Sequence, residues 1–181
     1  MRAGARPATP SQPTQRSAAL KPSDADFVDF VREASPRLLR AAWFICGDAH
    51  LAEDHVQQAL VKVYQRWGRL RGGNPTAYAR RCLVNQHVDE RRRSRESVVD
   101  QLPETPSSDA EPEDTRSLVA MLATLPLRER QVVVLRHYVG LPEAEVADTL
   151  GVSLGTVKSS ASRGLARLRD QLSREEQTHA H

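Results

Sequence analysis

The stretch LPEAEVADTLGVSLGTVKSSASRGLARLRDQL, Leu141–Leu172, decides the fold of the C-terminal part of this chain. Pro142 suits the first turn of a short helix, and Gly151 suits the position just past its end. Ser153 can then cap a second helix that begins near Leu154. Because the two helices are joined by a three-residue turn that contains glycine, the stretch predicts a helix-turn-helix.

The second of these helices has two chemically different faces. Small and apolar residues recur on one face at helical spacing: Val157, Ala161, Gly164, Leu165 and Leu168. The other face carries short hydrogen-bonding groups and cations: Thr156, Lys158, Ser159, Ser162, Arg163 and Arg167. Such groups in the N-terminal half of a recognition helix contact base edges and phosphates. A helical corner with a solvated face is the plainer alternative, but the whole pattern favours DNA binding.

Charge along the chain is arranged in blocks. The 181 residues carry 26 Lys and Arg against 23 Asp and Glu, a formal net charge of +3. Residues 1–23 contain four cations and no acid, whereas residues 96–115 contain seven acids and no base. We expect 1–23 to be a disordered basic tail and 96–115 to be a flexible acidic linker. The basic blocks on either side of the linker suit separate contacts with one polyanion.

Apolar periodicity predicts an all-α chain with two small helical domains, 24–95 and 116–174, joined by this linker. The helices expected in the first domain are Asp24–Gly47, Ala49–Trp67 and Thr76–Ser94. Pro36 should divide or kink the first of them, and Gly68–Pro75 reads as a loop. The helices expected in the second domain are Arg116–Thr124, Leu127–Val139, Glu143–Leu150 and Leu154–Ser173. Residues 175–181 are expected to form a disordered tail.

Two polar faces in the first domain are candidate binding surfaces. Opposite the apolar stripe of the second helix lie Asp54, Gln57, Gln58, Val61 and Gln65. A solvated surface and a partner-binding surface both fit this face. In the third helix, one face combines Tyr78, Cys82, Asn85 and Asp89. A buried Asn or Asp needs hydrogen-bond partners, so these are either satisfied core groups or functional groups.

No catalytic, metal-binding or membrane-spanning pattern is present in the sequence. Cys46 and Cys82 lack CxxC spacing, so we expect reduced thiols in a cytoplasmic protein. His50, His55 and His87 form no metal-ligand pattern with them. No apolar run approaches membrane-spanning length, and the N-terminus lacks the apolar segment of a secretory signal. We therefore expect no enzyme activity, no cofactor, no metal and no membrane insertion.

Three motifs in order resemble the bacterial RNA polymerase sigma factors of the extracytoplasmic-function (ECF) group. They are LAEDHVQQALVKVYQRW (Leu51–Trp67), AYARRCLVNQHVDERRR (Ala77–Arg93) and LPLRERQVVVLRHYVGLPEAEVADTLGVSLGTVKSS (Leu125–Ser160). The resemblance covers nearly all of Asp26–Leu172. The chain departs from the family pattern at four positions, His55, Gln58, Ser160 and Ala161, where the family commonly has Leu, Glu, Arg and a large aliphatic residue.

The resemblance implies a division of labour between the domains. The first domain would dock on the polymerase core through Asp54, Gln57, Gln58, Val61 and Gln65. It would hold the melted strand of the −10 promoter element through Asn74, Arg80, Asn85, Arg91 and Arg92, with an unstacked base in the loop. The second domain would read the −35 element in the major groove through Thr156, Lys158, Ser159, Ser162, Arg163 and Arg167. The implied partners are core polymerase and promoter DNA, and an anti-sigma factor is a further candidate.

Two other classes of protein fit parts of the pattern. A dimeric helix-turn-helix regulator, whose first domain senses a ligand or oligomerises, would need a palindromic site. An adaptor or antagonist would bind polymerase without reading DNA. Binding of promoter DNA by the chain alone, or only together with core polymerase, separates these classes.

Overall fold

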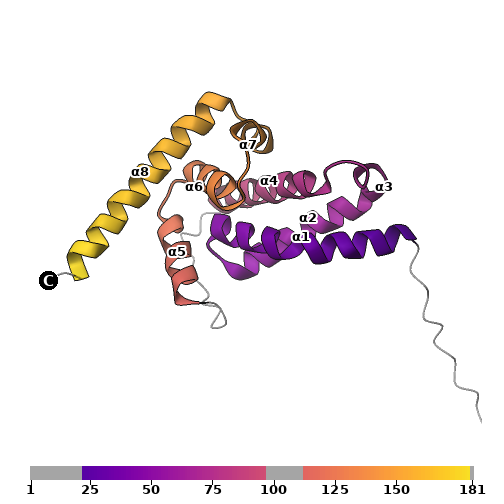
Figure 1. The fold of residues 1–181 in the computed structure, drawn as a ribbon, viewed down its shortest axis with the longest axis horizontal. Coiled ribbons are helices and arrows are strands. Elements are labelled where there is room, and N and C mark those ends of the chain that lie inside the picture. Colours follow the sequence, from indigo (N-terminus) through magenta and orange to yellow (C-terminus); the bar gives the residue numbers. More distant parts are fainter. Residues whose placement is uncertain (1–21, 97–111, 180–181) are drawn as a thin grey trace, which may run out of the picture.

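The structure, a computed structural model, describes residues 22–96 and 112–179 (Figure 1). Within these residues every regular element is helical and no strand occurs, which confirms the all-α class. In chain order the elements are α1 (Pro22–Cys46), α2 (Ala49–Gln65), α3 (Trp67–Leu70), α4 (Pro75–Glu96), α5 (Glu113–Ala123), α6 (Leu127–Val133), the π-helical segment η1 (Val134–Tyr138), α7 (Glu143–Leu150) and α8 (Leu154–His179). Most of the predicted basic tail and of the predicted linker lies outside the described residues.

The first domain is built on the packing of α1, α2 and α4. Fully buried alanines, Ala42 on α1 and Ala52 and Ala59 on α2, keep the helix surfaces smooth enough for close approach. The sequence predicts that Pro36 divides or kinks the first helix. The structure shows no division, because α1 runs from Pro22 to Cys46 as one helix with Pro36 inside it. Pro36 lies on the exposed side of α1, where water can satisfy the carbonyl group that loses its amide partner.

The predicted loop over Gly68–Pro75 is shorter in the structure. The short helix α3 follows α2 almost directly, because Trp67 is buried at its start and is held by aromatic neighbours. The Trp67 ring lies 5.2 Å, centroid to centroid, from both Phe27 and Phe30 of α1. The remaining turn ends at Asn74, whose Oδ1 accepts a hydrogen bond of 2.9 Å from the amide of Ala77 in α4.

The helix-turn-helix forms as predicted. Helix α7 has the predicted bounds and ends at Gly151, which adopts the left-handed conformation with φ of 62°. Ser153 caps α8, because its hydroxyl accepts a hydrogen bond of 3.1 Å from the amide of Thr156. Three helices in this domain differ from the prediction. Helix α5 begins at Glu113 rather than Arg116, and the helix predicted over Leu127–Val139 becomes π-helical at Val134. Helix α8 continues to His179, into the predicted disordered tail 175–181.

The two domains pack against each other. Helices α5 and α6 and the segment η1 contact α1, while α7 contacts α4 (Figure 1). The rings of Phe44 in α1 and Tyr138 in η1 meet edge to face, with centroids 4.8 Å apart. A groove of about 860 Å³ opens at this contact, with Arg37 and Arg80 of the first domain on its wall. The core is thus continuous across both domains.

Candidate nucleic-acid interface

The N-terminal half of α8 presents the polar face that the sequence predicts. Lys158 and Ser162 are exposed, and Thr156 and Ser159 are half-buried. The Ser159 hydroxyl donates to the carbonyl oxygen of Thr156, at 3.2 Å. On the opposite side of the helix, Val157 is fully buried against the core. The amphipathic orientation expected of a recognition helix is therefore present.

Ser160 lies on the buried side of α8 rather than on the polar face. It is 1% exposed, at the position where the sequence comparison with the ECF group leads one to expect arginine. Ala161, the next residue, is half-buried and packs against the core. The two departures from the family pattern therefore affect how α8 sits on its domain, and they leave the exposed polar face unchanged.

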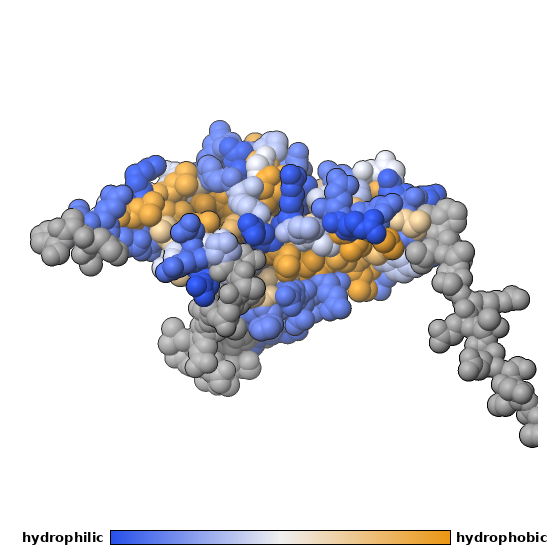
Figure 2. Space-filling view, turned by 60° about the horizontal axis from the view of Figure 1, so that its bottom comes forward, coloured by the Kyte–Doolittle hydropathy of each residue, from blue (hydrophilic) through white to orange (hydrophobic). Residues whose placement is uncertain are grey.

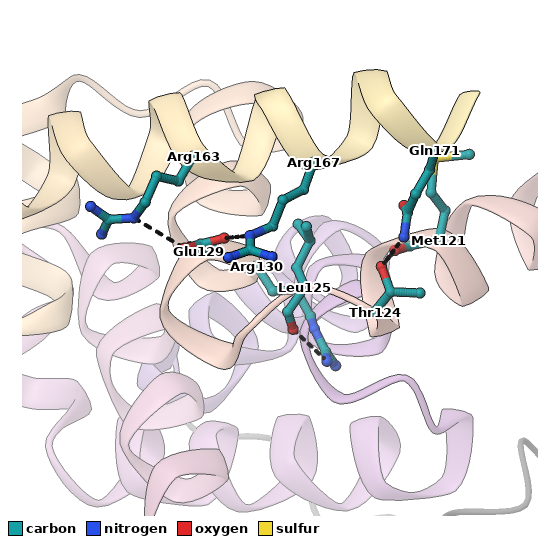
Figure 3. Close-up of polar contacts among 8 residues, drawn as sticks. All are labelled: Met121, Thr124, Leu125, Glu129, Arg130, Arg163, Arg167 and Gln171. Atoms are coloured by element: carbon teal, nitrogen blue, oxygen red, sulfur yellow. Dashed lines mark hydrogen bonds and ion pairs between the residues drawn. The ribbon is translucent and has the colours of Figure 1, made fainter. Parts of the chain in front are cut away.

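Glu129 of α6 lies beneath α8, between two of the candidate DNA-binding arginines (Figure 3). Its Oε1 accepts a hydrogen bond of 3.2 Å from Nε of Arg163, and its Oε2 lies 3.1 Å from Nε of Arg167. The carboxylate is buried, whereas both arginine side chains are 57% exposed. The contact is not predictable from the sequence, because Glu129 and Arg163 are separated by 34 residues and no motif pairs these two positions.

Gly164 explains why α8 approaches α6 so closely at this point. A Cβ atom at position 164 would lie 2.8 Å from Cγ2 of Val133 and 3.4 Å from Cβ of Glu129. Glycine costs about 1 kcal/mol relative to alanine in a helix interior, and the close packing of α8 on α6 that it allows here offsets this cost.

The residues predicted to bind the −10 element are distributed along α4 and the turn before it. Asn74, Asn85 and Arg92 are exposed, and Arg91 is half-buried. Arg80 is also half-buried, next to α7. Burial lowers the pKa of its guanidinium, and the carboxylate of Glu145 in α7 opposes that shift. The structure thus leaves Asn74, Asn85 and Arg92 open to solvent and places Arg80 beside the second domain.

The buried polar groups of α4 are not the ones expected. Asn85 and Asp89 point to solvent, whereas Gln86 and His87 are buried. With its amide oriented to satisfy both ends, Gln86 donates to the carbonyl oxygen of His55 at 2.9 Å and accepts from Lys62 at 3.3 Å. Of the two interpretations left open by the sequence, satisfied core groups or functional groups, the first does not hold for Asn85 and Asp89. Helix α4 is buried against α1, α2 and α7, which cover Gln86 and His87 instead.

His87 and His55 form a buried pair, with ring centroids 5.7 Å apart. Neither ring nitrogen of His87 has a hydrogen-bond partner. Burial lowers the pKa of His87 to about 3, and the nearby His55, Arg91 and Arg130 contribute in the same direction. His87 is therefore a neutral core residue at physiological pH. No group of three or more His, Cys, Asp or Glu side chains in the described residues could hold a metal ion.

The face of α2 predicted to bind polymerase is exposed along its whole length: Asp54, Gln57, Gln58, Val61 and Gln65. Val61 keeps 52% of its surface exposed, and Tyr64, three residues later on the same helix, keeps 50%. The Tyr64 ring packs against Phe27 of α1, with centroids 4.9 Å apart, so Val61 is the exposed apolar side chain among the polar residues of this face. Figure 2 shows one face of the molecule, on which hydrophobic residues lie exposed between hydrophilic ones.

Comparisons with known proteins agree on one family. The family model of sigma-70 region 2 matches residues 30–97, and that of sigma-70 region 4 matches residues 115–168. The RNA polymerase sigma-E factor of Streptomyces coelicolor is 38% identical over 152 residues, covering 81% of this chain and 86% of that protein. The ECF RNA polymerase sigma factor SigE of Mycolicibacterium smegmatis is 34% identical over 157 residues, covering 81% of this chain and 61% of that protein.

Solved structures show the same fold. A chain in the co-crystal structure of the sigma factor RpoE with the anti-sigma factor NepR from Bartonella quintana matches with a TM-score of 0.67 at 25% identity. The match covers 82% of this chain and 97% of that one. In the residues that the structure describes, no helix is long and apolar enough to cross a membrane.

Proposed function

The chain belongs to the ECF group of sigma-70 factors, which bind RNA polymerase core and direct it to promoters, and on this basis we propose which surfaces do each task. The chain acts in the cytoplasm by binding, without catalysing a reaction of its own and without a cofactor. Its first domain, 24–95, binds the polymerase and the −10 element. Its second domain, 116–174, binds the −35 element, and the acidic residues 96–115 connect the two.

The polymerase-binding surface in this proposal is the exposed face of α2. Asp54, Gln57, Gln58, Val61 and Gln65 take no part in the core of the domain. Amide and carboxylate groups around the exposed Val61 resemble the polar rim and apolar centre of a protein interface. This composition supports α2 as a docking helix.

The −10 surface in this proposal combines the turn before α4 with the cations along α4. Asn74, Asn85 and Arg92 are accessible, and Arg91 lies beside them. Exposed amides can hydrogen-bond an unstacked base, and arginines neutralise the phosphates of a single strand. Arg80 would bind a phosphate of the strand in place of the nearby Glu145 carboxylate, because both groups are negatively charged.

The −35 surface in this proposal is the polar face of α8: Thr156, Lys158, Ser159, Ser162, Arg163 and Arg167. The observation that carries it is the capped N-terminus of α8, after a glycine turn, with this face turned to solvent. Hydroxyls and guanidinium groups at the start of such a helix can contact base edges and phosphates together.

Transcription in vitro tests the proposed function. Purified chain is added to core polymerase with genomic templates, and start sites are mapped. We expect initiation at a defined set of promoters only when the chain is present. A dimeric regulator would instead bind palindromic DNA without core polymerase, and core-independent binding of that kind would refute the proposal. Because the sigma factor RpoE of Bartonella quintana was crystallised in complex with the anti-sigma factor NepR, an anti-sigma protein is a further proposed partner.

A further inference from the structure

Glu129 is a buried carboxylate held between two exposed cations of the recognition helix. Arg163 and Arg167 are one turn apart on α8. The Nε atom of Arg163 donates a hydrogen bond to Oε1 of Glu129, and the Nε atom of Arg167 forms an ion pair with Oε2, at 3.1 Å (Figure 3). The Glu129 side chain is only 8% exposed, so it is not one of many solvated surface acids. The helix contact at Gly164, the residue after Arg163, brings α8 near enough to α6 for both contacts to form.

This contact uses only one edge of each guanidinium. Arginine has five N–H groups, one on Nε and two on each Nη atom. With Nε facing Glu129, the end formed by the two Nη atoms is the pair that stays available to a ligand. That end can donate two parallel hydrogen bonds, to a phosphate or to O6 and N7 of a guanine.

We propose that Glu129 is a positioning residue for −35 recognition, which fixes the side chains of Arg163 and Arg167 so that their Nη ends face the DNA. The inference rests on the proposed function of α8. It adds a residue that lies outside the DNA surface and acts through the two arginines.

Fixing these side chains in advance favours selective binding. A free arginine loses the freedom of several torsions when it contacts a base, and a side chain already held by a partner loses less. A base reader must also be held near its productive geometry by a supporting contact. The supporting contact here is a charge-assisted one from beneath the helix, away from the DNA.

Two substitutions separate this role from simple neutralisation of charge. Glu129→Gln keeps the shape of the side chain and loses its charge. Glu129→Asp keeps the charge, but it is shorter by one methylene group and cannot reach both Nε atoms. Asp170→Asn, at an exposed position on α8, is the control for loss of one negative charge elsewhere in the second domain. The melting temperature of each variant is measured first, and Glu129→Asp decides the question if Glu129→Gln does not fold.

The readout is selection from a promoter library randomised at the −35 element, made with holoenzyme containing each variant. We expect both Glu129 variants to lose about fivefold or more of the preference at the base position that Arg163→Ala also relaxes. The preferences at other positions and the Asp170→Asn selection should match the wild type. In the Arg163→Ala background, Glu129→Asp should cause no further change at that position.

Other results overturn the proposal. If Glu129→Asp behaves as the wild type while Glu129→Gln binds every −35 sequence more tightly, the carboxylate only neutralises the two cations. If both variants keep the wild-type preferences, or if Arg163→Ala does so, Glu129 does not act through a base-reading arginine. A wild-type holoenzyme with no −35 preference would instead refute the proposed function of α8, so the two failures are distinguishable.

Discussion

Arg130, in the second domain, donates a hydrogen bond of 3.0 Å through Nη1 to the carbonyl oxygen of Ile45, 85 residues earlier in the chain. Its Nη2 donates to the carbonyl oxygens of Ala123, at 2.6 Å, and Leu125, at 3.2 Å. Because the last carbonyl groups of a helix have no partner within it, one guanidinium satisfies the ends of both α1 and α5. Arg130 is 5% exposed, so these contacts are made in the shared core.

Replacing Arg130 should therefore destabilise both domains together. We expect Arg130→Met, which keeps most of the side-chain volume, to lower the free energy of unfolding by about 3 kcal/mol, because buried carbonyl groups lose their donor. Chemical denaturation followed by circular dichroism measures this. Arg128→Met is the control, because Arg128 is half-buried and makes one long contact of 3.5 Å to Leu150. If the two variants are equally stable, the hydrogen bonds of Arg130 do not hold the two domains together.

Gly164→Ala tests the close approach of α8 and α6. Alanine is the better helix former by about 1 kcal/mol, but its Cβ would lie 2.8 Å from Cγ2 of Val133. We expect the clash to prevail, with a net loss of stability of about 1–3 kcal/mol, and Val133→Ala to reduce that loss in the double variant. Gly155→Ala is the control, since a Cβ there would meet only the Ser153 hydroxyl, at 3.8 Å. The thermal midpoints of the four variants decide whether packing or propensity dominates.

His87 should make the stability of the chain depend on pH. Its pKa is about 3 in the folded state, against about 6.5 for an exposed histidine, so the unfolded state binds more protons between these values. Stability is therefore lost as the pH falls below about 6.5, by up to about 1.4 kcal/mol per pH unit from this group. We expect His87→Leu to lose about 2 kcal/mol less than the wild type between pH 7.5 and pH 5.0. Urea denaturation at both pH values gives this difference, and the exposed His50→Gln should not change it.

The sequence predicts structural features that depend on neighbouring residues, and it does not predict contacts between residues far apart in the chain. The bounds of α7 and the turn after it were predictable, because Pro142, Gly151 and Ser153 act on their immediate neighbours. The contacts of Glu129 and Arg130 were not, because their partners lie in other helices far along the chain. The sequence left open whether Asn85 and Asp89 of α4 are core groups, for a related reason: which polar residues of α4 are buried depends on the three helices packed around it.

The polymerase-binding role of α2 predicts a selective loss of function. Asp54→Arg combined with Gln58→Arg should weaken binding to core polymerase while leaving the fold intact, because both residues are exposed. Competition with the wild-type chain for core polymerase measures the effect. Asp170→Arg combined with Ser173→Arg makes the same change in net charge at exposed positions of α8 and should compete nearly as well as the wild type. If the α2 variant competes equally, its face is ordinary surface.

Lys158 and Arg163 should make different kinds of contact with the −35 element. We expect Arg163 to read a base, because its planar end suits guanine, and Lys158 to bind a phosphate as a compact, exposed charge. Arg163→Ala should then cost about 1–3 kcal/mol and relax the preference at one position. Lys158→Ala should weaken all −35 sequences alike and reduce the salt dependence by about one unit of slope. Selection from a randomised −35 library, with binding measured at several salt concentrations, distinguishes the two roles. If the wild-type preference survives Arg163→Ala, or if Lys158→Ala alone changes it, the assignment is wrong.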